Sequence, residues 1–173
     1  MSLTETLTLL THLKLFLIAM WFGAALFFSA VVAPSAFSVM RAFQLDNTGE
    51  IAGTLVTRTL SVVNVSGFVI GVLLWATALA FAQRVGRRSF VLELISALVL
   101  ATTTAVGHWV IAARMRALRA AMVIPIDQVP IDDPRRMVFN RLHGYSVTAL
   151  GIAMIAALVA FAVVAYRMRV RTN

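Results

Sequence analysis

Long apolar runs separated by short polar clusters are the dominant pattern of this chain. The runs extend from Leu7 to Val32, Leu60 to Ala82, Phe90 to Ala113 and His143 to Ala165. The hydrocarbon core of a bilayer is about 30 Å thick, so about 20 helical residues cross it. Lipid offers the backbone no hydrogen-bond partner, so each crossing segment must be helical. The pattern therefore predicts an all-α fold, a four-transmembrane-helix bundle that forms a single domain over residues 1–173.

The polar clusters predict where the first two helices end. Ala33 precedes Pro34, and the residue before a proline is biased away from helical conformation, so the first span should end there. Residues Ser35 to Gln44 carry apolar side chains at helical spacing, which favours a short interfacial helix after the first span. Cap and turn residues at Asp46 to Glu50 should start the second helix, which we expect to run without a break to about Gln83.

The remaining helix boundaries follow from caps and prolines. A short basic turn precedes the third helix, with Ser89 as its expected N-cap residue. This helix should extend past the bilayer as Arg114 to Ala121. After a proline-containing loop, Asp132 or Asp133 should cap the last helix, because Pro134 suits a first helical turn.

Composition supports a membrane protein and gives no indication of nucleic acid binding. The chain is 61% hydrophobic and 13% charged, with a mean hydropathy of +0.91, well outside the averages of soluble proteins. Its net charge of +8 comes from basic residues at helix ends, where they contact lipid headgroups and fix orientation. The absence of cysteine excludes disulfides, thiolate metal sites and cysteine nucleophiles.

The basic residues also predict an orientation. Four spans place both termini on one side, together with the short turn that contains Arg84, Arg87 and Arg88. Basic residues are dense near the span ends on this side, where the positive-inside rule is strongest. We expect both termini to be cytoplasmic in a bacterial inner membrane, and the excess of arginine over the single lysine, Lys14, suggests a GC-rich bacterial genome.

Polar residues inside the apolar runs are the best indication of function, because they are costly in lipid. The third and fourth spans are antiparallel, so His108 and His143 should lie at a similar depth, near the start of the second span. The pattern predicts a polar layer toward the outer leaflet, made of Arg58, Asn64, Thr104, His108, Asn140, Arg141, His143 and Tyr145.

Two interpretations of the histidines remain open. His108 and His143 could supply both axial ligands of a b-type haem, or bind a metal of unknown identity. The more ordinary interpretation is that each imidazole hydrogen-bonds a neighbouring helix or sits among headgroups. No metal-binding motif such as HExxH accompanies them in the sequence.

Small residues predict close helix contacts. Gly67 and Gly71 form a GxxxG motif on the second helix, next to Asn64 on the same face. Gly144 and Gly151 lie two turns apart on the last helix and should act in the same way. Packing within the bundle is a commoner role for such residues than a dimer interface.

Two segments resemble a known family. The run from Trp21 to Phe28, followed by Ala33-Pro34 and Phe37, is similar to the first-helix signature of a bacterial domain-of-unknown-function family akin to the eukaryotic transmembrane protein 205. Phe139 to His143 with Ser146 resembles the last-helix motif of that family, and Ala52-Gly53 matches a further pair. Leu60 and Val63 depart from the aromatic and proline-containing run expected there. The resemblance implies a four-helix membrane protein without an established activity.

These observations favour a non-enzymatic membrane protein. We expect an accessory or interaction subunit of a membrane complex, in contact with the lipid bilayer and other membrane subunits but not with nucleic acid. A redox protein that binds haem b or a metal is the first alternative. A small-solute transporter is the second, and it would need a water-lined path.

Overall fold

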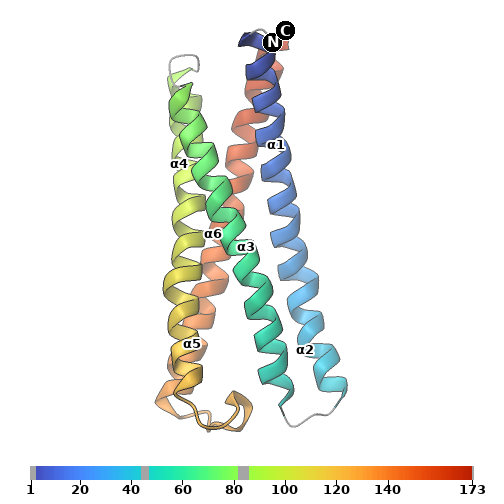
Figure 1. The fold of residues 1–173 in the computed structure, drawn as a ribbon, viewed down its shortest axis with the longest axis vertical. Helices are drawn as coiled ribbons and strands as arrows, with labels where there is room; N and C mark the ends of the chain where they lie inside the picture. Colours follow the sequence, from blue (N-terminus) through green and yellow to red (C-terminus); the bar gives the residue numbers. More distant parts are fainter. Residues whose placement is uncertain (1–2, 44–46, 82–85, 173) are drawn as a thin grey trace.

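The computed structural model describes residues 3–43, 47–81 and 86–172, and it has the expected fold class. Figure 1 shows long helices side by side, with both chain ends at the same end of the bundle. The helices are α1 (Leu3–Phe27), α2 (Ala33–Ala42), α3 (Thr48–Ala80), α4 (Arg87–Ala105), α5 (Ala112–Ala120) and α6 (Pro134–Thr172). The described residues contain no strand.

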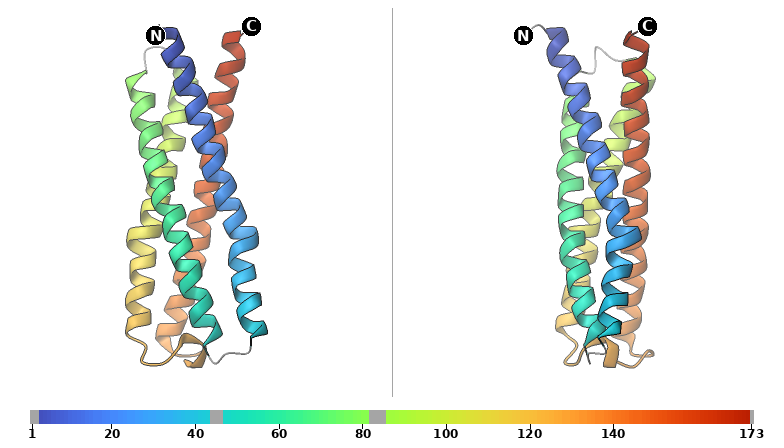
Figure 2. Two further views of the ribbon diagram at one scale, coloured as in Figure 1. Left: turned by 45° about the vertical axis from the view of Figure 1, so that its right-hand side comes forward. Right: turned by 90° about the vertical axis from the view of Figure 1, so that its right-hand side faces the viewer.

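These elements form four units that are long and apolar enough to span a membrane, as the sequence predicted. The units are α1 with α2, α3 alone, α4 with α5, and α6 alone. Their candidate spans are Glu5–Ala42, Thr48–Ala80, Arg87–Ala120 and Pro134–Arg169, with 38, 33, 34 and 36 residues. A helix of 33 residues is about 50 Å long, whereas the hydrocarbon core is about 30 Å thick. Figure 2 shows the units running along one common direction, so their ends would reach the headgroup regions.

The first unit corrects the boundary expected at Pro34. The backbone of Ala33 is helical, and its N–H bonds the carbonyl oxygen of Phe28 in a π-helical turn, Phe28–Val32, that joins α1 to α2. A proline lacks an N–H and its ring collides with the carbonyl four residues earlier in a regular α-helix. The wider π turn interrupts the regular α-helical hydrogen-bond pattern just before Pro34. The proline therefore does not end the helix, which continues to Ala42.

The starts of α3 and α4 agree in part with the boundaries that we expected from the sequence. Helix α3 starts at Thr48 and runs unbroken to Ala80, whereas the end expected near Gln83 lies outside the described residues. Helix α4 begins at Arg87, with Gly86 as its N-cap residue. The expectation that Ser89 caps this helix is wrong, because Ser89 lies inside its first turn.

The start of α6 confirms the expected cap. The Arg135 backbone N–H donates to Oδ1 of Asp133 at 2.7 Å, the usual bond of an N-cap aspartate. The Arg135 guanidinium also contacts Oδ2 of Asp133 at 2.9 Å. The hydrogen bonds from Arg135 lower the pKa of Asp133 from 3.8 to about 2.

The core of the bundle combines small and large apolar residues from all four units. Its fully buried members include Ile18, Leu100 and Ala157. The indole Nε1 of Trp21 donates to the backbone carbonyl oxygen of Val63 at 2.8 Å, which joins α1 to α3 by a hydrogen bond as well as by packing.

The predicted glycine contacts occur on α3 but not on α6. A Cβ atom on Gly67 would lie 2.8 Å from both Trp21 and Thr104, and one on Gly71 would lie 2.8 Å from the backbone nitrogen of Ala101. These glycines face the interior of the bundle. No neighbouring atom lies within 4 Å of a Cβ on Gly144 or Gly151, so close helix packing does not explain these two.

We predict that Gly71→Ala destabilises the bundle. The added methyl would meet the backbone of α4, and overpacking of this kind costs about 1–3 kcal/mol. Gly144→Ala is the matched control, because its methyl enters open space and should stabilise by about 0.5–1 kcal/mol. Thermal unfolding in mild detergent, followed by circular dichroism, measures both. Equal unfolding temperatures for the two variants would contradict the contact.

We also predict an acid-sensitive contribution from Asp133. Because its folded pKa is lowered to about 2, its stabilisation is complete above the unfolded value of about 3.9 and is lost as pH falls toward 2. Asp133→Asn keeps a capping oxygen but does not titrate. The difference in unfolding temperature between wild type and this variant should therefore shrink between about pH 5 and pH 2. A difference independent of pH would contradict this assignment.

Candidate functional site

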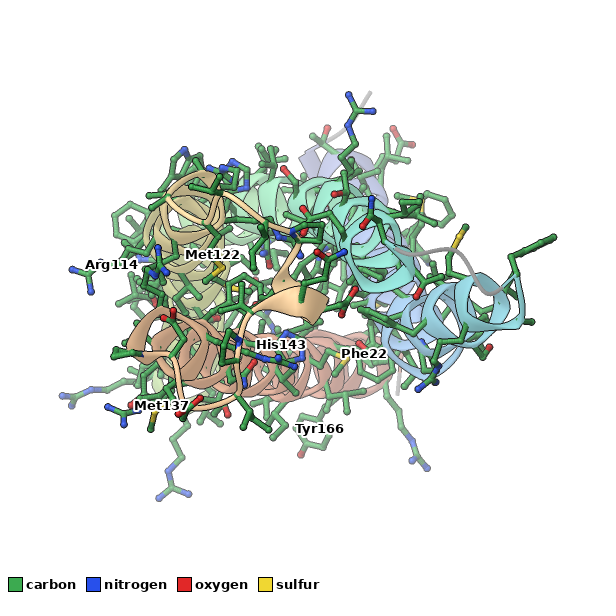
Figure 3. All side chains as sticks on the ribbon, turned by 90° about the horizontal axis from the view of Figure 1, so that it is seen from below. Phe22, Arg114, Met122, Met137, His143 and Tyr166 are labelled. Atoms are coloured by element: carbon green, nitrogen blue, oxygen red, sulfur yellow. The ribbon has the colours of Figure 1, made fainter. Side chains whose placement is uncertain are left out.

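A cavity of about 450 Å³ lies between the helices in the half of the bundle that contains the α2–α3 and α5–α6 connections. Its wall is mainly apolar, and each of the four helical units contributes to it. Figure 3 views the bundle from this end, with His143 beside the space between the helices and the short turn Ile126–Gln128 lying across that end. The cavity combines an apolar wall with buried polar groups, which makes it a candidate ligand site.

Polar and apolar groups are separated along the length of this cavity. Helices α3 and α6 both run away from the connections, so their lower-numbered lining residues lie nearer that end. On α3 the lining extends from Val56 to Asn64, about 12 Å at 1.5 Å per residue. Arg116 and Arg119 belong to the end near the connections, which we call the mouth, whereas Asn64 belongs to the opposite, inner end.

The mouth is held together by Arg119. Its Nε lies 3.4 Å from Oε1 of Glu50, and its guanidinium carbon lies 5.4 Å from the centre of the Phe139 ring. A Cβ atom on Gly53 would lie 2.5 Å from this guanidinium, so the glycine leaves room for it. Arg119 therefore connects α5 to α3 and α6, and one acid offsets its charge.

Two buried polar side chains away from the mouth make no hydrogen bond to the described residues: Asn64 at the inner end of the α3 lining, and Ser146 midway along the α6 lining between Phe139 and Met154. Asn64 is 4% exposed and Ser146 is 8% exposed, and both line the cavity. The other serines of the wall do have partners. Ser29 donates to the Ala25 carbonyl oxygen at 2.8 Å, and Ser61 contacts Nδ1 of His108 at 3.2 Å. Buried polar groups are normally paired, so Asn64 and Ser146 are available to a ligand.

The two candidate haem ligands have different surroundings. His143 lines the cavity, whereas His108 does not. The His108 ring contacts Ser61 through Nδ1 and packs edge-on against Trp109, with ring centres 4.9 Å apart. His108 lies in a π-helical turn, Val106–Ile111, between α4 and α5.

The remaining members of the expected polar layer do not converge on the cavity. Thr104 is buried and faces the space at Gly67, and its hydroxyl bonds carbonyl oxygens of its own helix. The other four are exposed and absent from the cavity wall: Arg58, Asn140, Arg141 and Tyr145. Within the described residues, no three His, Asp or Glu side chains gather as a metal site.

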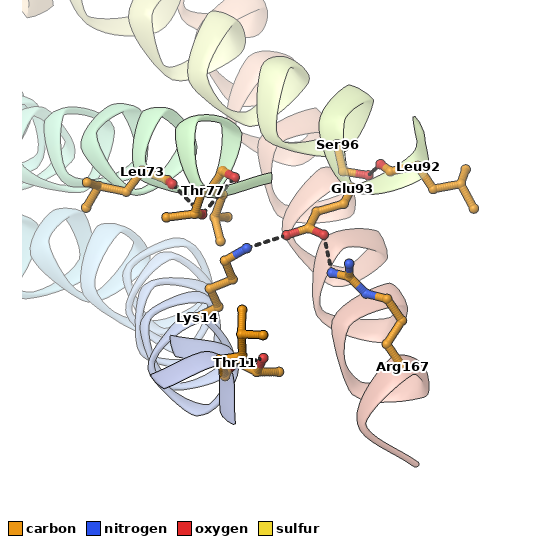
Figure 4. Close-up of polar contacts among 10 residues, drawn as sticks. Thr11, Lys14, Leu73, Thr77, Leu92, Glu93, Ser96 and Arg167 are labelled. Carbon is orange, nitrogen blue, oxygen red and sulfur yellow. Dashed lines mark hydrogen bonds and ion pairs between the residues drawn. The ribbon is translucent and has the colours of Figure 1, made fainter. Parts of the chain in front are cut away.

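A buried ion cluster at the opposite end of the bundle was not expected. Glu93 is 1% exposed. Its Oε1 accepts a hydrogen bond from the Lys14 ammonium at 2.9 Å, and its Oε2 accepts one from the Arg167 guanidinium. Figure 4 shows this carboxylate between α1 and α6, with Ser96 on its own helix and Thr77 on α3 close by. The cluster joins three helical units and carries one excess positive charge.

The sequence contained a signal for this cluster. Glu93 is the single acid in the apolar run from Phe90 to Ala113, and acids in such runs usually have a charged partner. Lys14 and Arg167 are both far from Glu93 in the sequence. Their distance from Glu93 in the sequence concealed that the three positions share one depth in the bundle.

Comparison with known proteins gives a family match. The profile of a domain of unknown function (DUF4149) matches residues 16–123, which is more than half of the chain. The match includes the first-helix motif at Trp21 but ends before α6. The likeness to the eukaryotic transmembrane protein 205 stays a prediction. No curated protein and no solved structure matches the chain.

We predict that Glu93→Leu destabilises the protein by about 3 kcal/mol, because it leaves two largely buried cations without their anion. The triple variant Lys14→Met, Glu93→Leu, Arg167→Met should recover most of this loss, since an apolar group can replace a buried ion cluster at little cost. Thermal unfolding in detergent measures both variants. If the triple variant is no more stable than Glu93→Leu, unpaired charge is not the cause of the lost stability.

Proposed function

The chain belongs to the DUF4149 family, and from this premise we propose that it is an integral membrane protein whose cavity binds a lipid-soluble small molecule. The observation that carries the proposal is the cavity between the four helical units. Its volume of about 450 Å³ lies within the range of small-molecule sites, about 300–1,000 Å³. Its wall is mostly apolar, with polar groups at both ends.

The membrane surroundings favour this class of ligand. An apolar cavity holds water poorly and takes up apolar molecules. Phe28, Leu150 and Met154 contribute apolar surface to the wall. The arginines of the mouth belong at the level of lipid headgroups, where guanidinium groups are hydrated or contact phosphate. A molecule dissolved in the bilayer would thus meet a site that matches its polarity.

The placement in the cell is also a proposal. The end of the bundle that holds both chain termini carries Lys14, Arg87, Arg88 and Arg167. The positive-inside rule supports cytoplasmic termini in a bacterial inner membrane. An accessory role in a larger membrane complex is consistent with binding, because such a subunit could hold a ligand for its partner.

The geometry gives less support to haem or metal binding. A haem with two imidazole ligands requires both rings to approach the iron from opposite sides of one cavity. His143 lines the cavity and His108 does not, so the two rings are not presented to a common space.

The cavity wall also lacks a continuous polar path, which weakens the case for a small-solute transporter.

A cavity-filling substitution tests the proposal. Gly151 lines the cavity, and a Cβ there meets no neighbouring atom within 4 Å, so Gly151→Leu should occupy ligand space without disturbing helix contacts. Gly144→Leu is the matched control, because Gly144 is equally open but does not line the cavity. Native mass spectrometry of the protein in mild detergent, after incubation with a bacterial lipid extract, measures retained molecules.

Wild type and Gly144→Leu should retain a bound molecule, and occupancy in Gly151→Leu should fall about tenfold or more, since the added side chain takes up part of the site. Equal occupancy in the two variants would contradict the proposal, as would a wild-type protein that retains nothing. A reduced b-type haem absorption band in the wild type that His143→Ala abolishes would favour the haem alternative.

A further inference from the structure

Resting on the proposed cavity function, we propose that the inner end of the cavity binds the headgroup of a quinone-type molecule, a lipid-soluble ring that carries carbonyl oxygens. The groups that would recognise it are the Asn64 amide and the Ser146 hydroxyl. Phe28 of the wall would contact the ring. The proposal concerns binding and assigns no redox chemistry to the protein.

The unpartnered polar groups are the first argument. Asn64 and Ser146 lie on different helices, are more than nine-tenths buried and both contribute to the wall of the same cavity. Neither hydrogen-bonds a described residue. An amide N–H₂ and a hydroxyl are both donors, so together they suit a ligand with acceptor oxygens. A purely apolar occupant would leave both groups unsatisfied, which is unfavourable.

The distribution of charge is the second argument. A carboxylate or phosphate would require a cation, but the cations of the wall, Arg116 and Arg119, lie at the mouth, away from Asn64. Arg119 already faces Glu50 at 3.4 Å. The inner end is lined by neutral groups, so it matches the neutral carbonyl oxygens of a quinone better than an anion.

The aromatic content of the wall is the third argument. Phe28, in the π-helical turn between α1 and α2, lines the cavity away from the mouth, whereas Phe37 and Phe139 line it nearer the mouth. Aromatic rings pack favourably against another planar ring. His143 lines the cavity about one turn nearer the mouth than Ser146, and its ring nitrogens can donate or accept a hydrogen bond. A headgroup held by Asn64 and Ser146 would leave its tail to extend along the apolar wall.

The test compares two probes that share a tail. Decylubiquinone carries a quinone ring, and n-decylbenzene carries a ring without oxygen. Each probe is titrated against the purified full-length protein in mild detergent, and its dissociation constant is obtained from the rise in unfolding temperature, because a ligand that binds the folded state stabilises it. The variants are Asn64→Leu, which nearly conserves volume, and Ser146→Ala. Asn140→Leu is the control, since Asn140 is exposed and outside the cavity wall.

Wild type and Asn140→Leu should bind decylubiquinone at least tenfold more tightly than n-decylbenzene. Asn64→Leu and Ser146→Ala should each weaken decylubiquinone binding about tenfold, the effect of one lost hydrogen bond, and leave n-decylbenzene binding unchanged. Variants that unfold at the temperature of wild type without ligand establish that the effect is local.

Two results would overturn the headgroup assignment and leave the proposed function standing. One is equal affinity of wild type for the two probes. The other is unchanged decylubiquinone affinity in Asn64→Leu and Ser146→Ala, which would mean that water satisfies these groups. If neither probe binds and Gly151→Leu changes no retained molecule, both proposals fail.

Discussion

The need to satisfy backbone hydrogen bonds within each helix is the constraint on which this structure depends. In apolar surroundings no solvent can bond a free N–H or carbonyl group, so the chain forms four long helical units. Association between those units then depends on side chains. The contacts that hold them include the Trp21 hydrogen bond to Val63, the close approach of α4 to Gly71, and the ion cluster at Glu93. Each of these is a contact between units that apolar packing alone would not specify.

The helices could be predicted from the sequence because their cause is local. Apolar length sets the spans, and an aspartate followed by a proline sets the start of α6. The boundary at Pro34 was wrong because the bias of the preceding residue is weak, and a π-helical turn absorbs the irregularity. The Ser89 cap failed for a different reason: several adjacent residues can start a helix, and Gly86 was sufficient.

The candidate site could be predicted less well, because it depends on which faces of the helices meet. Asn64 and His143 were identified as polar residues of one layer, and both line the cavity. Asn140 and Tyr145 lie within three residues of His143 in the sequence but are outside the cavity wall. The position of a residue around the helix axis decides whether it meets the cavity. Glu93, Lys14 and Arg167 come together only through the packing of three units. Such contacts require the relative depth and rotation of the helices, which hydropathy does not encode.

The two π-helical turns have a consequence for how this chain tolerates change. Phe28–Val32 and Val106–Ile111 each precede a segment that lines the cavity, and each holds one more residue per turn than an α-helix would. Losing one residue from such a turn would restore a regular helix and leave the residues beyond it facing nearly the same way, because the π turn accommodates one extra residue in about the same rotation. The same loss from a regular stretch of α-helix would rotate Phe37 by about 100° and remove it from the cavity wall. These two turns are therefore the places where a unit could lose one residue and keep its cavity-lining face.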